Sequence, residues 1–204
     1  MKKIDVKKTL KQLYQPSAKE IACVDVPEMN FLMVDGEGDP NTSKSFSDAI
    51  EALYPVSYTL KFMVKKGPLA IDYGVMPLEA LWWADDLSAF TMGKKDDWKW
   101  TVMVMQPDFI TREMVNEALA EVARKKNPVS LPLVRFETFT EGKAAQTMHI
   151  GHFSTEGPTI EKVHQVIADN GRHPVGKHHE IYLSDLRRTV PEKWKIIIRQ
   201  PMLP

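Results

Sequence analysis

Alternating and continuous apolar runs predict three strands in the first half of the chain. Residues 21–34 are apolar and rich in β-formers, and Pro27 and Asn30 mark a turn that splits them into two short pieces. Residues 79–83 form a further strand-like run. In residues 98–105, apolar side chains occupy both the odd-numbered and the even-numbered positions. That pattern is typical of a strand buried on both faces.

Helical spacing of apolar residues predicts two helices in the same half. Ser43 or Ser45 can cap a helix over residues 46–54. Residues 58–64 are either extended or a continuation of that helix, because periodicity alone does not decide. A third segment, residues 111–126, begins at a capping threonine and carries apolar residues at helical spacing.

The second half shows the same kinds of segment. Residues 134–140 and 144–152 read as two short strands, and a helix begins at about Glu156 and ends at Asn170-Gly171, a pair suited to a left-handed cap. Residues 178–184 and 195–200 are the last predicted strands. The order strand, helix, strand, strand therefore occurs twice.

The two occurrences resemble each other, and their final strands align residue by residue. WTVMVMQP from Trp100 matches WKIIIRQP from Trp194, Gly36 falls on Gly151, and Glu79 falls on Glu180. A repeated unit of this kind predicts a pseudo-symmetric α+β domain in which two half-covered sheets join into one. We expect a ligand cleft where the halves meet, since binding sites favour such junctions.

These patterns set the domain boundaries. Residues 1–20 form a short helical arm that Pro16 ends. A single domain follows over residues 21–204, with one half at about 21–126 and the other at about 131–204.

Composition narrows the class of partner. The 204 residues hold 27 Lys plus Arg and 27 Asp plus Glu, which gives no basic footprint for nucleic acid. One cysteine, Cys23, excludes an intrachain disulfide and agrees with the reducing cytoplasm. No apolar run reaches the ~20 residues that cross a bilayer, and the basic start lacks the apolar stretch of a secretory signal.

Glu180 and Tyr182 are the candidate functional pair. Side chains two apart on a strand share a face, so the acid and the phenol lie side by side. Burial in an aromatic surrounding raises the pKa of a carboxyl and makes it a better base. The competing interpretation is an ordinary ion pair of Glu180 with Arg187 or Arg199.

Two segments carry a family resemblance. EIYLSD from Glu180, followed by RRTVPEKWKIIIRQP, and EALWWADD, followed by WKWTVMVMQP, resemble the GyrI-like small-molecule-binding domain over roughly Ile21 to Pro201. The resemblance implies duplicated βαββ units (SHS2-type), a curved antiparallel sheet with helices on one side, and a central ligand cleft. It also implies bulky aromatic, lipophilic or cationic drug-like ligands, with a glutamate matching Glu180 at the floor of the pocket.

The stand-alone members that this chain resembles include hydrolases of cyclopropane-bearing alkylators. By that resemblance Glu180 would steer a water and Tyr182 would assist it, and no DNA-binding domain is expected at either end. The expected ligand-binding residues are aromatic side chains and one histidine: Trp82, Trp83, Tyr58, Phe62, Tyr73, Trp100 and His178.

Other residue patterns carry no chemistry. The histidines lack metal-ligand spacing, so we expect no metal and no cofactor, and we expect His178 and His179 at a surface or edge. Cys23 is interpreted as an inert buried thiol. Glu156 can cap the helix or reach the cleft mouth, and the cap is the preferred interpretation.

Three functions remain open. The first is hydrolysis of an electrophilic, strained-ring toxin. The second is binding, sequestering or sensing of small molecules without catalysis. The third is inhibition of a topoisomerase, which the neutral charge does not support.

Overall fold

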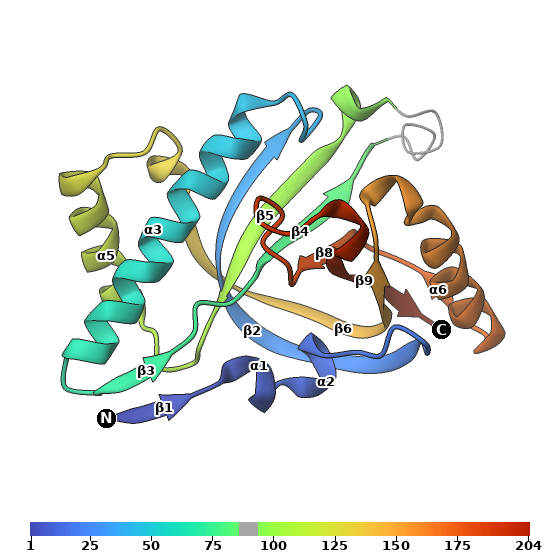
Figure 1. The fold of residues 1–204 in the computed structure, drawn as a ribbon, viewed down its shortest axis with the longest axis horizontal. Coiled ribbons are helices and arrows are strands. Elements are labelled where there is room, and N and C mark those ends of the chain that lie inside the picture. Colours follow the sequence, from blue (N-terminus) through green and yellow to red (C-terminus); the bar gives the residue numbers. More distant parts are fainter. Residues whose placement is uncertain (86–93) are drawn as a thin grey trace. The chain divides into compact units, whose positions relative to one another are not determined.

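The computed structural model describes residues 1–85 and 94–204 (Figure 1), so part of the predicted loop over residues 85–97 lies outside the described residues. These residues form two compact units. Unit 1 comprises residues 1–6, 29–76 and 82–139, and unit 2 comprises residues 7–28, 77–81 and 140–204. The units interleave along the sequence because three strands each run from one unit into the other.

Figure 1 labels the elements. The three shared strands are β2 (Ala22–Glu37), β4 (Leu78–Trp83) and β6 (Arg135–Ile150). Unit 1 also holds β1 (Lys2–Ile4), α3 (Lys44–Lys66), β3 (Ile71–Tyr73), η1 (Lys95–Asp97), β5 (Lys99–Gln106), α5 (Arg112–Lys125) and η2 (Leu131–Leu133). The other elements are α1 (Val6–Thr9), α2 (Lys11–Tyr14), η3 (Phe153–Thr155), α6 (Gly157–Asp169), β7 (His173–Pro174), β8 (His178–Tyr182), η4 (Pro191–Lys193) and β9 (Lys195–Leu203).

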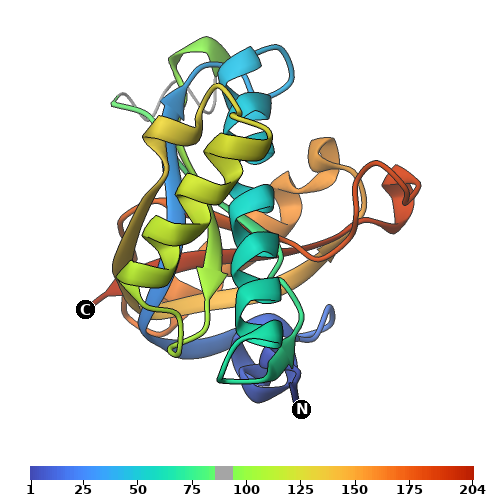
Figure 2. The same ribbon diagram turned by 90° about the vertical axis from the view of Figure 1, so that its left-hand side faces the viewer.

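Helix α3 is the main helix of unit 1, and it includes residues 58–64, which settles their helical character. Pro55 lies inside it and removes one helical hydrogen bond. The helix continues because its apolar stripe is buried, from Ala49 to Val64. It packs against β3, β5 and α5, and Figure 2 shows α5 lying alongside it.

Helix α5 begins as the sequence predicts. The Thr111 side chain accepts a hydrogen bond from the Met114 backbone N–H at 3.4 Å. Ser43 occupies the position before α3 but makes no capping bond; its hydroxyl lies 2.6 Å from that of Ser45 instead.

In unit 1, β2 pairs with β5 in antiparallel fashion and β1 pairs with β3 in parallel fashion. In unit 2, β9 lies between β6 and β8 and is antiparallel to both. Helix α6 covers β9 through a fully apolar cluster of Ala145, Val163, Ile167, Ile198 and Met202. The helix ends at Asp169, and Gly171, two residues further on, has the predicted left-handed conformation with a φ of 67°.

The strand registers confirm the internal repeat. In unit 1, Gly36 pairs with Trp100 and Met33 with Met103. In unit 2, Gly151 donates its N–H to Trp194 O at 3.0 Å, and Met148 pairs with Ile197. The expected α+β class with an antiparallel sheet is therefore confirmed.

Several expected local features are wrong. β2 is one strand that passes through Pro27 without a turn, and β6 is one strand that passes through Gly142 at a φ of 74°. The arm begins as strand β1 and becomes helical only from Val6. Cys23 is exposed rather than buried, and Val26 is the one buried residue in the segment 22–28.

No helix in the described part of the chain is long and apolar enough to span a membrane.

Candidate functional site

Strand β8 presents Glu180 and Tyr182 from one face, as predicted. The Tyr182 hydroxyl donates a hydrogen bond to Glu180 Oε2 at 2.7 Å. The Glu180 side chain is 12% exposed, so the carboxylate is largely shielded but still reached by solvent. A short bond between a phenol and a carboxylate fixes the direction of both groups.

His178 lies on the same face of β8. Its Nε2 atom is 3.3 Å from Glu180 Oε1, and its side chain is 18% exposed. The structure therefore brings together three of the expected residues, Glu180, Tyr182 and His178, within unit 2.

Glu156 also lies near this group, although the sequence favoured a helix cap over a position at the cleft mouth. It immediately precedes α6 but makes no capping hydrogen bond. Its backbone is already helical, with φ −75° and ψ −26°, whereas a capping side chain needs an extended residue. Residues 153–155 form the turn η3, which sets this conformation and which the sequence pattern did not indicate.

The Glu156 carboxyl is buried at 5% exposure, and its Oε1 atom has no hydrogen-bond partner among the described residues. Burial, and then the negative charge of Glu180, raise the pKa of Glu156 to about 9. At neutral pH the site therefore combines a protonated carboxyl with a nearby negative charge. Such a pair can donate a proton at one group and accept one at the other.

Aromatic rings lie beside the two acids. The Phe153 ring meets the Tyr182 ring edge-on, with 6.0 Å between centroids, and lies 5.0 Å from the Trp194 ring. His152 stacks on Trp194 at 5.4 Å, and Trp194 Nε1 donates to Thr189 O at 2.8 Å. None of these rings was among the expected ligand-binding residues.

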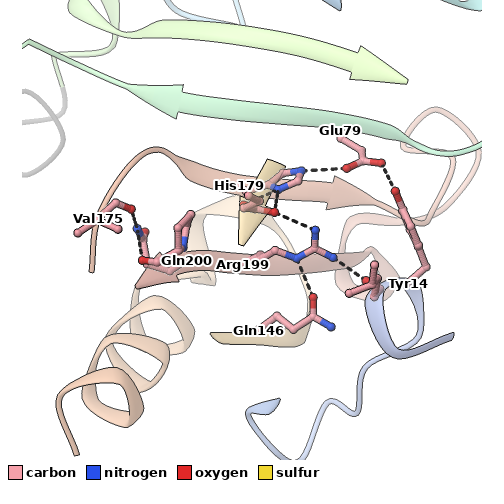
Figure 3. Close-up of polar contacts among 10 residues, drawn as sticks. Tyr14, Glu79, Gln146, Val175, His179, Arg199 and Gln200 are labelled. Atoms are coloured by element: carbon pink, nitrogen blue, oxygen red, sulfur yellow. Dashed lines mark hydrogen bonds and ion pairs between the residues drawn. The ribbon is translucent and has the colours of Figure 1, made fainter. Parts of the chain in front are cut away.

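The competing ion pairs of Glu180 are not formed. Arg199 binds Glu141, with 3.0 Å between Nη1 and Oε2 (Figure 3), and Arg187 lies 3.4 Å from Asp185. His179 is 1% exposed, so its expected surface position is wrong. It faces away from Glu180 because it is the next residue on the strand.

The predicted match of Glu79 with Glu180 is also wrong. On β4, Trp82 stacks on Phe46 of α3 with 5.5 Å between centroids, so Glu79, an odd number of residues away, faces the other side. Glu180 faces the α6 side, because it pairs with Ile198, which packs against α6, and because its charge helps raise the pKa of Glu156. Ala80 therefore holds the position that Glu180 occupies in the repeat, and the acid has no twin in the first repeat.

Two expected aromatic residues lie in the core of unit 1. Trp82 is 5% exposed and Trp100 is fully buried, and both contact the Phe46 ring. Their indole Nε1 atoms have no hydrogen-bond partner within the described part of the chain. Gly36 makes room for Trp100, since a Cβ there would lie 2.2 Å from two ring carbons.

The remaining expected residues lie on α3, β3 and β4, outside the group on β8. Trp83 follows Trp82 and so points to the opposite face of β4. Tyr58 and Phe62 are 48% and 47% exposed on α3. Tyr73 is buried edge-on to Phe109, and burial raises the pKa of its phenol. Ligand contact at these positions stays a prediction.

The described residues contain no group of three or more His, Cys, Asp or Glu side chains arranged to hold a metal ion.

Comparison with known proteins extends this picture. A family model described as the GyrI-like small molecule binding domain matches residues 19–201. The structure of an uncharacterized conserved protein from Listeria innocua is 41% identical, with a TM-score of 0.90, and the match covers 98% of this chain and 100% of the other. A search of curated proteins found no match.

Two further structures from Listeria innocua are described as hydrolases. They are 39% and 40% identical, with a TM-score of 0.86 each. The matches cover 98% and 99% of this chain and 100% of each of the others.

Proposed function

Since the chain belongs to the GyrI-like small-molecule-binding domain family, we propose that it binds a bulky aromatic or lipophilic molecule beside Glu180 and hydrolyses strained cyclopropane electrophiles. The observation that carries this proposal is that the shielded Glu180 carboxylate, held by the Tyr182 hydroxyl at 2.7 Å, lies near the buried Glu156 carboxyl. Burial, and then the charge of Glu180, raise the pKa of Glu156 to about 9. The aromatic edges of Phe153 and Trp194 offer the apolar contact that such a ligand needs.

The reaction uses the two acids in different roles. Glu180 orients a water and takes its proton while the water oxygen bonds to a ring carbon of a cyclopropane conjugated to a dienone. The strained C–C bond breaks, and its electron pair moves to the dienone oxygen. That oxygen takes a proton from Glu156, so the net change in the ligand is addition of one water. Passage of the proton from Glu180 back to Glu156, directly or through solvent, then restores the starting state.

Tyr182 has a supporting role. Its hydrogen bond to Glu180 at 2.7 Å holds the carboxylate in one direction, which is the condition for aiming a water at one carbon. Release of ring strain supplies the driving force, so modest acid and base catalysis is sufficient.

The two Listeria neighbours described as hydrolases support a hydrolytic reaction, because their matches span nearly the whole chain at about 40% identity. The single, exposed cysteine supports a cytoplasmic location.

A Glu180→Gln variant tests catalysis, because glutamine keeps the size of the side chain but removes the base. We expect turnover of a dienone cyclopropane, followed by its ultraviolet absorbance, to fall at least 100-fold. We expect the Kd from tryptophan fluorescence quenching to change less than fivefold. Undiminished turnover in this variant would remove Glu180 from the mechanism.

Binding or sensing without catalysis is the second candidate, and the description of the family as a binding domain favours it. Wild-type protein that quenches on ligand addition but opens no strained ring would establish this alternative. In the same fluorescence titration, wild-type protein that shows no quenching with any ligand would contradict both candidate functions.

A further inference from the structure

A fully buried polar cluster lies on the reverse face of β8, opposite Glu180 and Tyr182. We define it as the reverse-face network, and it consists of Tyr14, Glu79, Glu141, Gln146, His179 and Arg199. Figure 3 labels all of these residues except Glu141. His179 pairs with Arg199 on β9, and Arg199 pairs with Gln146 on β6. The three side chains thus form one row across three strands.

His179 is held at both ring nitrogens. Nδ1 lies 2.9 Å from Glu141 Oε1, and Nε2 lies 2.9 Å from Glu79 Oε2. Carboxylate oxygens accept hydrogen bonds, so both nitrogens must donate and the ring is an imidazolium. Burial lowers the pKa of His179, but Glu141 and Glu79 outweigh it and raise the value to about 9.

Arg199 extends the network to the N-terminal arm. Its Nε donates to Gln146 Oε1 at 2.8 Å, and its Nη2 donates to Leu13 O at 2.8 Å. Tyr14 donates its hydroxyl to Glu79 Oε1 at 2.7 Å. The two acids and two cations balance in charge, and α2, β4, β6, β8 and β9 each contribute at least one group.

Stability alone does not require such a network. Apolar side chains of similar volume usually replace a buried ion network at no loss of stability, whereas removing one member leaves an unpaired charge. The charged groups instead fix the orientation of the side chains, because a hydrogen bond is strongest when donor, hydrogen and acceptor are nearly in line. Hydrogen bonds to Glu79 on β4 and Glu141 on β6 fix the orientation of the His179 ring. The next residue on the same strand is Glu180.

We propose that His179 and Arg199 are positioning residues that fix the orientation of β8 and thereby hold Glu180 and Tyr182 in register with Glu156. This inference rests on the proposed function for its kinetic consequence, but the positioning itself concerns only the orientation of the acids. The charged and titratable groups facing His179 are Glu79 on β4, Glu141 on β6 and Arg199 on β9.

The variant His179→Gln breaks the network, because both amide donors of glutamine sit on one nitrogen and its carbonyl oxygen cannot donate to the second acid. The double variant Glu79→Gln/His179→Gln restores charge balance and serves as the rescue. Ile181→Val is the matched control, since Ile181 is buried on the same face of the same strand and lies outside the network. All are compared below their unfolding midpoints, at equal folded fraction.

The first readout is independent of turnover. In protein labelled with ¹³C at glutamate side chains, we expect the carboxyl resonances and titration midpoints of Glu156 and Glu180 to move in His179→Gln. They should return toward wild type in the double variant and stay unchanged in Ile181→Val. Unmoved resonances in folded His179→Gln, or equal movement in Ile181→Val, would overturn the proposal.

If His179→Gln does not fold, Arg199→Lys replaces it as the disrupting variant, with the same readout. Resonances of Glu156 and Glu180 that match wild type in Arg199→Lys would then overturn the proposal.

The second readout is kinetic. With the dienone cyclopropane as probe, we expect kcat to fall at least tenfold in His179→Gln while KM changes less than threefold. If wild type shows no turnover, hydrolysis fails as the function, and the resonances alone decide the positioning role.

Discussion

At the scale of single residues, the two glutamates of the site differ in burial and hydrogen bonding although they are the same residue type. Glu180 borders solvent and accepts a hydrogen bond from Tyr182, whereas Glu156 is buried with one oxygen unpartnered among the described residues. Glutamate in the sequence predicts an acid but not its protonation, because protonation depends on neighbours distant along the chain.

Glu156 should make stability fall with rising pH. Its folded pKa of about 9 exceeds the unfolded value of 4.5, so the folded state binds the extra proton between these limits. Stability should then drop by roughly 1 kcal/mol per pH unit across this window. Urea unfolding of wild type and Glu156→Gln from pH 5 to 9 checks this, and parallel curves for the two proteins would contradict it.

Gly36 is a second residue whose identity is fixed by a neighbour. A Cβ at this position would lie 2.2 Å from the Trp100 ring, which is itself fully buried and cannot retreat. We expect Gly36→Ala to cost roughly 2 kcal/mol or more through overpacking. Gly74→Ala is the control, because its Cβ would meet no atom within 4 Å; thermal unfolding of both variants gives the comparison.

At the scale of elements, β8 combines two separate sets of side chains. Its even-numbered residues form the candidate site, and His179 joins the reverse-face network. Because each set uses only one parity, the strand can serve both without compromise in either.

The reverse-face network should have a stability optimum in pH. The pKa of His179 is raised from 6.5 to about 9, so its contribution is complete below 6.5 and lost as pH rises through 9. The pKa of Glu141 is lowered from 4.5 to about 2, mainly by His179 and Arg199 against the effect of burial. That contribution is complete above 4.5 and lost as pH falls through 2.

Both contributions are therefore present together between pH 4.5 and 6.5. We expect the difference in unfolding free energy between wild type and Glu79→Gln/His179→Gln to be largest there and to shrink toward pH 9. A difference that stays constant from pH 5 to 9 would mean that His179 carries no excess proton in the folded state.

The sequence predicted the positions of helices and strands better than the points at which strands are interrupted. Periodicity located α5, β5, β8 and β9 within a few residues, because each buries a face with regular spacing. It misplaced breaks at Pro27 and Gly142, since a long strand tolerates such residues where no ladder hydrogen bond is needed. The repeat alignment was shifted by one residue at Glu79. Both faces of β4 are mostly apolar, so the sequence does not show which residues face the helix.

The candidate site was predicted in part for the same reason. Glu180, Tyr182 and His178 share one strand, so their proximity follows from alternation alone. The site also includes side chains from two distant segments: Phe153 and Glu156 at the turn before α6, and Trp194 immediately before β9. Only the fold brings these segments near Glu180. Long-range placement of this kind has no local sequence signal.

At the scale of the whole molecule, chain connectivity joins the two units. β2, β4 and β6 are each continuous strands with residues in both. Loss of one unit would break strands that belong to the other, so we infer that the molecule unfolds as one.

Fluorotryptophan ¹⁹F spectra can test this cooperativity. Trp194 belongs to unit 2, whereas Trp82, Trp83, Trp98 and Trp100 belong to unit 1. We expect all resonances to lose intensity with one midpoint in urea. A Trp194 midpoint separated from the others by more than the error of measurement would show that the units unfold independently.

The alternation along β8 has a consequence for how this protein can change. Substitutions at 178 and 182 alter the surface offered to a small molecule while the buried charges behind them stay untouched, so new ligand preferences are accessible through point changes. Insertion or deletion of one amino acid before His178 would exchange the two sides of the strand, placing an imidazolium where the acid stood. Lineages that diversify here should therefore vary in residue identity but keep segment length constant.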